Sequence, residues 1–180
     1  MVTEKLISEA TSKYLKLMDK AGIALSDEER NNVEICDYNL SRFDEIGTGI
    51  IIHVNTKRCC AKEIILYPWQ ICPEHIHPQL GDYPGKEETF RCRWGEVYLY
   101  VEGEPAGAPK AKLPADKEDT FTVWHEIILK PGEQYTLKEK TWHWFQAGPL
   151  GAVVSEFSTP SFDDKDIFRD QEITRLSNLK

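Results

Sequence analysis

The sequence predicts an all-β protein, a barrel or a sandwich of short strands, with helices only at its N-terminal end. From Ile50 onward, short runs of β-branched and aromatic residues follow one another at intervals of about ten residues. Turn segments rich in glycine and proline separate these runs, for example at 81–86 and 130–133. No internal repeat or low-complexity segment interrupts the pattern, which is typical of barrels and sandwiches.

Length and composition favour one domain. A chain of 180 residues is long enough to bury a substantial core. Hydrophobic residues make up 41% and charged residues 29%, as in ordinary soluble globular proteins. We therefore expect a single domain over 1–180, with an N-terminal helical segment (1–49), a barrel (50–158) and a C-terminal tail (159–180).

Charge and cysteine content narrow the classes of partner. A net charge of −8 disfavours nucleic acid and anionic membranes, which need basic surfaces, but does not argue against a neutral substrate. The charged N-terminus does not read as a signal peptide, and no apolar run approaches the ~18 residues of a membrane span. Five cysteines, an odd number without a C-x-x-C pair, indicate buried thiols rather than a disulfide framework. These features predict a cytoplasmic protein.

Two helices are expected before the first strand. Gly22 is placed as the C-cap of the first helix, which spans residues 3–20. Ser26 and Glu29 form a capping box, so a second, short helix should begin at Asp27. One face of the first helix is apolar: Leu6, Ile7, Ala10, Tyr14, Leu17 and Met18. We expect both helices to pack against the outside of the sheet and to carry no chemistry.

Eight strands are expected after the helices. Residues 102–114, rich in glycine and proline, are interpreted as a solvated loop near one rim, with a lid over a pocket as the alternative. In the polar tail, Asp163, Asp164 and Asp166 are most simply a solvated acidic run. The predicted strands are 49–56, 61–68, 71–77, 96–103, 120–129, 133–138, 141–148 and 152–158.

Three histidines and a glutamate suggest a metal site. His75 and His77 are two residues apart, so on a strand both rings point to the same face. Glu88 follows eleven residues after His77, and His143 lies on a later predicted strand. Three imidazoles and one carboxylate are a ligand set that a divalent transition metal can use.

The stretch PEHIHPQLGDYPGKEETFRCRWG, residues 73–95, resembles the first cupin motif: H-x-H, then a glutamate, six residues and a glycine. The segment 131–145, PGEQYTLKEKTWHWF, is similar to a loose second motif that ends at its histidine. Ten residues separate His77 from Glu88, whereas the motif usually has three or four. That inserted loop and the context GKEETF resemble the D-lyxose isomerase group of sugar-isomerising cupins. The likeness covers about residues 50–168 and extends to the tail, where it would place one of the three aspartates near the barrel mouth.

The resemblance implies a cupin-type β-barrel, a double-stranded β-helix or jelly roll. It implies a metal-dependent aldose–ketose isomerase that acts on D-lyxose and D-xylulose, with D-mannose and D-fructose as related substrates. Mn²⁺ is the implied metal, with Fe²⁺, Co²⁺ or Zn²⁺ as alternatives. By analogy with dimeric cupins, the implied assembly is a homodimer.

Glu88, rather than its neighbour Glu87, is predicted to be the carboxylate ligand. Six residues lie between Glu88 and Gly95, as the first cupin motif requires. Adjacent residues of a strand face opposite ways, so only one of the two can point inward.

Two further charged residues are expected to face the pocket. Lys62 shares its strand face with Ile64 and Leu66, and Glu156 shares its face with Val154 and Ser158. An inward charge is costly unless it is paired or used, so both are candidate catalytic residues. The alternatives are a lysine that extends to the rim and a glutamate in a structural ion pair.

Together these residues indicate a ketol-isomerase mechanism. A metal with two open positions can chelate O1 and O2 of an aldose and stabilise the enediolate that forms when the C2 proton leaves. Glu156 could move that proton between C2 and C1, with Lys62 assisting. Two other classes share the ligand set: a cupin iron oxygenase, and a cupin that binds a sugar or effector without catalysis.

Overall fold

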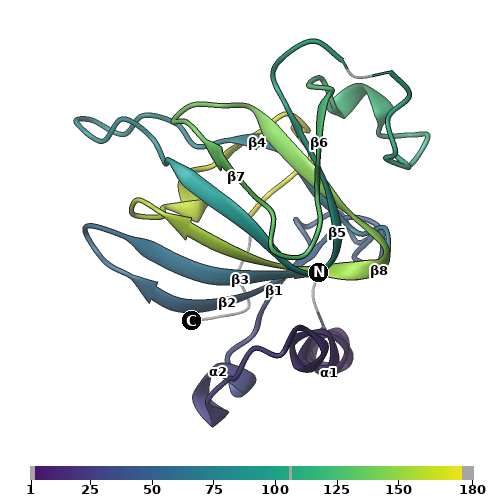
Figure 1. The fold of residues 1–180 in the computed structure, drawn as a ribbon, viewed down its shortest axis with the longest axis vertical. Helices are drawn as coiled ribbons and strands as arrows, with labels where there is room; N and C mark the ends of the chain where they lie inside the picture. The colour runs from purple at the N-terminus through teal and green to yellow at the C-terminus, as the bar shows by residue number, and fades with distance from the viewer. Residues whose placement is uncertain (1–2, 106, 176–180) are drawn as a thin grey trace.

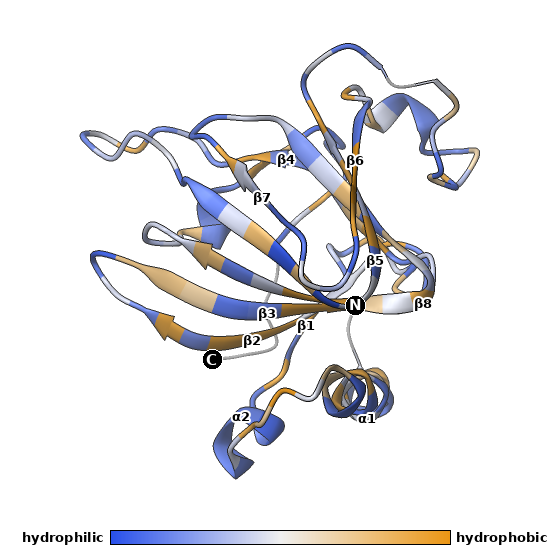
Figure 2. Cartoon of the chain, in the orientation of Figure 1, coloured by the Kyte–Doolittle hydropathy of each residue, from blue (hydrophilic) through white to orange (hydrophobic). Residues whose placement is uncertain are grey.

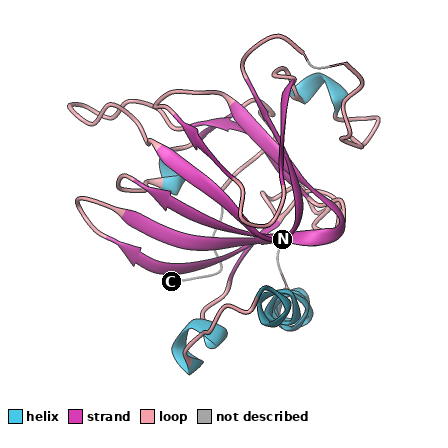
Figure 3. Ribbon diagram, viewed as in Figure 1, coloured by secondary structure: helices cyan, strands magenta, loops and turns pink. Residues whose placement is uncertain are grey.

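The computed structural model describes residues 3–105 and 107–175, and strands dominate this part of the chain (Figure 3). Its helices are α1 (Glu4–Ala21) and α2 (Asp27–Asn31), with short 3₁₀ turns at Glu118–Thr120 and Asp163–Lys165. Its strands are β1 (Glu34–Cys36), β2 (Thr48–Asn55), β3 (Cys60–Leu66), β4 (Ile71–Ile76), β5 (Glu88–Val101), β6 (His125–Leu129), β7 (Gln134–Leu137), β8 (His143–Ser158) and β9 (Ile167–Phe168).

The strands form one curled antiparallel sheet that closes into a half-open barrel (Figure 1). The order along the sheet is β1–β2–β3–β8–β4–β9, while β5 pairs with β6, β7 and β8. The long strands β5 and β8 pair along both of their halves, from Glu88 opposite Ser158 to Val101 opposite His143. The predicted all-β, cupin-type barrel with helices packed outside is therefore confirmed.

Glycines bend the two long strands instead of ending them. The register between β5 and β8 shifts between Gly95 and Val97, where residues 148–151 of β8 bulge out of the ladder. Gly95 has φ 72°, and a Cβ atom there would lie 1.9 Å from the carbonyl oxygen of Gly151. The sequence prediction divided β8 into 141–148 and 152–158 and left residues 88–95 of β5 outside any strand, whereas the structure continues each strand through its bulge.

The N-terminal helices cover the outer face of the sheet below β2 and β3 (Figure 1). Thr3 caps α1 at its start, and Gly22 ends it in the left-handed conformation. Tyr14 and Met18 of α1 are fully buried against outward-facing side chains such as Ile51. Residues 1–49 also contribute β1, which pairs with β2 and was not predicted. In the described part of the chain, α1 and α2 are both too short or too polar to span a membrane.

Apolar side chains from both halves of the sheet fill the closed part of the barrel. Hydrophobic and hydrophilic residues alternate along several strands (Figure 2), as expected when one face is buried. Phe90, Leu99 and Phe145 belong to this interior core. Outside the β5–β8 pair, residues 111–124 pack over Tyr100 and Trp144, while the described residues of 102–110 are exposed, as predicted for a solvated loop.

The bulge makes a specific prediction about Gly95. A Gly95→Ala variant adds a left-handed strain of about 1–2 kcal/mol and also a clash with a backbone carbonyl that cannot rotate away. Gly132→Ala is the matched control, because Gly132 also has a positive φ of 92° but nothing lies within 4 Å of its added Cβ. Urea unfolding should show a loss of about 1 kcal/mol for Gly132→Ala and at least about 3 kcal/mol for Gly95→Ala. Equal losses would contradict the close approach of β5 and β8.

Candidate active site

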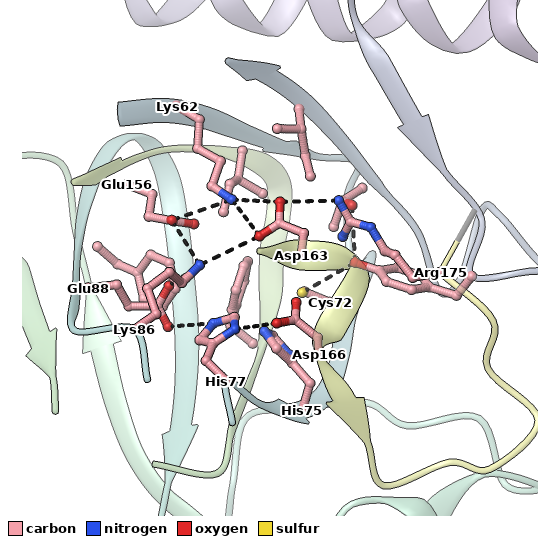
Figure 4. A pocket seen from close by; sticks show the side chains of 16 residues that line it. Lys62, Cys72, His75, His77, Lys86, Glu88, Glu156, Asp163, Asp166 and Arg175 are labelled. Atoms are coloured by element: carbon pink, nitrogen blue, oxygen red, sulfur yellow. Dashed lines mark hydrogen bonds and ion pairs between the residues drawn. The ribbon is translucent and has the colours of Figure 1, made fainter. Parts of the chain in front are cut away.

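One end of the barrel holds a pocket that is lined by charged side chains (Figure 4). They come from β3, β5 and β8, from β4 and the loop after it, and from the chain that follows β8. Apolar residues, among them Ile64, Phe90 and Phe145, also line the pocket. The charged and histidine residues that line it are Lys62, His75, His77, Lys86, Glu88, Glu156, Asp163, Asp166 and Arg175.

Three buried histidines meet at this pocket. His75 on β4 lies directly opposite His143 on β8, with ring centroids 4.2 Å apart. His77, just beyond the end of β4, is 4.9 Å from His75 by the same measure. One nitrogen from each ring lies within 4.8 Å of the others, close enough for a single ion.

Hydrogen bonds at Nδ1 leave Nε2 of each ring for a ligand. His75 Nδ1 lies 2.8 Å from the Pro73 carbonyl, and His143 Nδ1 lies 2.9 Å from the Thr141 carbonyl. His77 Nδ1 is 2.5 Å from an oxygen of Asp166. An oxygen accepts at each Nδ1, so this nitrogen carries a proton, and Nε2 is the nitrogen that can bind a metal once it is unprotonated.

Glu88 supplies the carboxylate of the same cluster. Its Oε1 lies 3.1 Å from Nε2 of His77 and 3.1 Å from Nε2 of His143. Within the described residues, the buried His143 Nε2 has no partner with hydrogen-bond geometry. The donor set and this unsatisfied nitrogen fit a divalent metal ion. We call His75, His77, Glu88 and His143 the His₃Glu centre.

Electrostatics separates the pKa values within the centre. Burial and the two neighbouring imidazoles hold the pKa of His75 well below its usual value. Burial and Lys86 oppose the cation of His77, but Glu88 and Asp166 outweigh them and raise its pKa to about 9. Burial disfavours the Glu88 anion, but Lys86, His77 and His143 hold its pKa well below the usual value.

Two buried lysines flank Glu156. Lys86 Nζ lies 3.0 Å from Oε1 of Glu156 and 2.8 Å from Oε2 of Glu88, so one ammonium group contacts both carboxylates. Lys62 Nζ lies 3.5 Å from the same oxygen of Glu156 and 2.9 Å from Asp163. Despite the penalty of burial, these carboxylates raise the pKa of Lys62 and, more strongly, that of Lys86. Both lysines are therefore cations at neutral pH.

Strand parity placed the predicted residues on the inner face. Lys62 on β3 is directly opposite Glu156 on β8, and both are buried in the pocket. Lys62 does not extend to the rim, which was the alternative for it. Glu156 does form ion pairs with lysines, as the alternative of a structural ion pair expected, but it stays in the pocket. Glu88 is 1% exposed, whereas Glu87 is exposed. This is the arrangement expected if Glu88, and not Glu87, points into the pocket.

Two charged residues of the pocket, Lys86 and Arg175, were not identified from the sequence, and the resemblance expected one aspartate near the barrel mouth where the structure places two. Lys86 is the ninth of the ten residues between His77 and Glu88 and lies two residues before Glu88, so strand parity could have found it. The prediction of a solvated acidic run was wrong for Asp163 and Asp166, which pair with Lys62 and His77, and right for the exposed Asp164. Arg175 reaches the pocket because the chain folds back after β8.

Comparison with known proteins identifies the family of the chain. Residues 24–180 match the family described as D-lyxose isomerase. A D-lyxose ketol-isomerase from a Thermofilum species is 52% identical over 99% of both chains. A D-lyxose/D-mannose isomerase from Thermosediminibacter oceani is 48% identical over 100% of this chain and 99% of its own. Among solved structures, L-ribose isomerase from Cellulomonas parahominis superposes with a TM-score of 0.79, at 17% identity over 98% of this chain and 97% of its own. That structure supports the fold.

Metal uptake should release a proton. With a pKa of about 9, His77 holds a proton at pH 7.5 in the metal-free protein, and a ligating nitrogen must lose it. Isothermal titration with Mn²⁺ in buffers of different ionisation enthalpy should give about one proton released per metal at pH 7.5. Release should fall toward zero above about pH 9, and the affinity should rise with pH up to that point. Uptake without proton release at pH 7.5 would contradict the assignment.

The two adjacent glutamates form a matched pair. Glu88→Gln should lower Mn²⁺ affinity by at least about tenfold, because an amide cannot supply the charge of the ligand. Glu87→Gln should change the affinity by less than about twofold, since Glu87 is exposed outside the pocket. Metal content after dialysis measures both variants, and the opposite ranking would show that the register of β5 is different.

Proposed function

This chain belongs to the D-lyxose isomerase family and is a sugar ketol-isomerase, and we propose that it interconverts D-lyxose and D-xylulose at a divalent metal ion. The observation that carries the proposal is the position of Glu156. It is buried between two lysines, and one of them, Lys86, also contacts Glu88 of the His₃Glu centre. A carboxylate that is fixed beside a metal centre is the arrangement that proton transfer at carbon needs.

D-Mannose and D-fructose are proposed as further substrates. The relative from T. oceani is named a D-lyxose/D-mannose isomerase. D-Mannose carries one more carbon than D-lyxose, at the end of the chain away from C1 and C2. Because isomerisation changes only C1 and C2, a pocket that tolerates the extra carbon can act on both sugars.

The His₃Glu centre is proposed to hold Mn²⁺. Three imidazoles and one carboxylate leave an octahedral ion two open positions, whereas zinc prefers four ligands in all. When bound, the metal polarises the sugar carbonyl and stabilises the charge that develops on two neighbouring oxygens of the substrate.

Glu156 is proposed to move the proton. Its carboxylate accepts the proton from C2 of the aldose and returns it to C1, and the hydroxyl proton of O2 passes to O1; the two transfers together give the ketose. Lys86 and Lys62 hold the carboxylate in place from two sides, and Ser158 Oγ donates to it at 3.2 Å. The apolar side chains of Ile64, Phe90 and Phe145 also line the pocket, and we propose that they limit the access of water to the substrate.

We further propose a cytoplasmic homodimer. All five cysteines are free thiols, which suits a reducing compartment. Val54 and Phe157 are exposed apolar side chains in register with Ala61 between them, on the outer face of three adjacent strands. A second copy of the chain could cover this strip, and light scattering at several concentrations measures the assembly.

The function is tested at Glu156. A positioned base contributes about 10²–10⁴-fold in rate, so Glu156→Gln should lower kcat by that factor while Mn²⁺ content stays normal. Glu63→Gln is the matched control, because Glu63 is also buried, and the parity of β3 places it on the opposite face from Lys62, where it accepts from Ser155. D-Xylulose formation from D-lyxose measures turnover. Near-normal turnover of Glu156→Gln would rule out the proton shuttle.

Solvent hydrogen distinguishes proton transfer from hydride transfer. In D₂O, a proton carried by Glu156 exchanges in part with solvent, so deuterium should appear at C1 of the ketose. A hydride that moves directly from C2 to C1 brings in no solvent deuterium. Complete absence of deuterium, together with an active Glu156→Gln enzyme, would establish the hydride route.

A further inference from the structure

The three histidines of the His₃Glu centre are oriented in two different ways. His75 and His143 each donate from Nδ1 to a backbone carbonyl two residues earlier in the chain. Those acceptors belong to the same local strand segment, so they are present whenever the barrel is folded. His77 instead donates to Asp166, a side chain 89 residues away. Its orientation therefore depends on a separate segment of the chain.

That segment, residues 161–175, is the C-terminal segment, and it crosses the pocket beside β4. Its strand β9 pairs with the end of β4, with Phe168 opposite His75. Arg169 donates to Glu74 both from its backbone N–H, at 2.9 Å to the carbonyl, and from Nε, at 3.0 Å to the carboxylate. Glu74 is 1% exposed, so this ion pair fastens the segment to the back of the histidine strand.

The other end of the segment is held by two more ion pairs. Asp170 accepts from Lys117 at 2.7 Å, and Arg175 lies 2.9 Å from Glu34 on β1. Neither contact involves a ligand of the metal. The segment can therefore be loosened from a distance, without a change at the His₃Glu centre itself.

We propose that Asp166 is a positioning residue for His77, and that it couples docking of the C-terminal segment to metal binding. The proposal rests on the proposed metal centre. The carboxylate fixes the ring orientation and the tautomer that leave Nε2 of His77 directed at the centre. Coupling is reciprocal by thermodynamic necessity: whatever factor the docked segment adds to metal affinity, bound metal adds to docking of the segment.

Metal affinity tests the positioning role. Asp166→Asn keeps the shape of the side chain and removes its charge. Asp164→Asn is the matched control, because Asp164 is exposed and, among the described residues, its ion pair is with Lys165 at the surface. In calorimetric titrations of the full metal-free chain with Mn²⁺, Asp166→Asn should raise Kd by about 10–100-fold. Asp164→Asn should stay within about twofold of the unaltered protein. An Asp166→Asn protein with an unchanged Kd would overturn the proposal.

Hydrogen exchange tests the coupling. In the unaltered protein, Mn²⁺ should slow amide exchange in residues 166–170, and this protection should shrink by the same factor by which Asp166→Asn weakens the metal. The Asp164→Asn control should keep the full protection. Equal exchange with and without Mn²⁺ in the unaltered protein would refute the coupling.

Lys117→Met provides a second route if Asp166→Asn does not fold. This change releases Asp170 at a distance from every ligand and should weaken Mn²⁺ binding by about fivefold or more. An unchanged Kd would again overturn the coupling.

His77→Ala distinguishes a failure of the proposed metal centre from a failure of the positioning role. If His77→Ala keeps Mn²⁺, the metal centre itself is wrong; if it loses Mn²⁺ while Asp166→Asn and Lys117→Met bind normally, only the positioning role fails.

Discussion

The buried contact of Lys86 with Glu88 and Glu156 is the interaction on which the rest of the site depends. Removing one partner from a buried ion pair typically costs about 3–5 kcal/mol, because the charge left behind stays in a poorly solvated place. Lys86 is 3% exposed and its two carboxylate partners are 1% and 2% exposed. Each member therefore helps to stabilise the others, and Lys86 links a proposed metal ligand to a proposed base. The long connection between His77 and Glu88 has a physical reason in this unit, since it brings Lys86 inside.

The continuous pairing of β5 with β8 keeps this unit in register. Glu88 and Phe90 face inward on β5, while Glu156 and His143 face inward at opposite ends of β8. A slip of one residue would turn every one of these side chains to the outer face. The bulge at Gly95 and residues 148–151 adds twist and lets both halves of the ladder keep their own register. Gly95, the glycine of the first motif, is thus required by the backbone. It allows the bulge that keeps Glu156 and His143, at opposite ends of β8, at a fixed separation.

Periodicity explains how much of this could be predicted. Alternation along a strand was enough to place Lys62 and Glu156 on the inner face, because parity is a local property, and the motif spacing to Gly95 selected Glu88 over Glu87. The capping residues Ser26 and Gly22 likewise predicted both helices from nearby residues. Local patterns could not show that Gly95 and Gly148 continue a strand, since a bulge and a turn have the same composition. They also could not place Asp163, Asp166 and Arg175, whose partners are between 12 and 141 residues away in the sequence.

The charge balance of the pocket links its parts. Four carboxylates and three cations line it, and Arg175 is shared with a fifth buried carboxylate, Glu34, so two negative charges are in excess among the described residues. One divalent ion would balance that excess. Without the ion, a proton is the available cation. The excess negative charge acts on His77 through Glu88 and Asp166, which raise the pKa of its imidazole. At the proposed metal centre, metal and proton would therefore compete for the His77 ring, and Asp166 would favour whichever cation is bound. A neutral sugar could then enter without disturbing the balance, because it brings hydroxyl groups and no charge. This fits the proposed reaction, in which the charge that develops on the substrate would be surrounded by the metal and the two lysines.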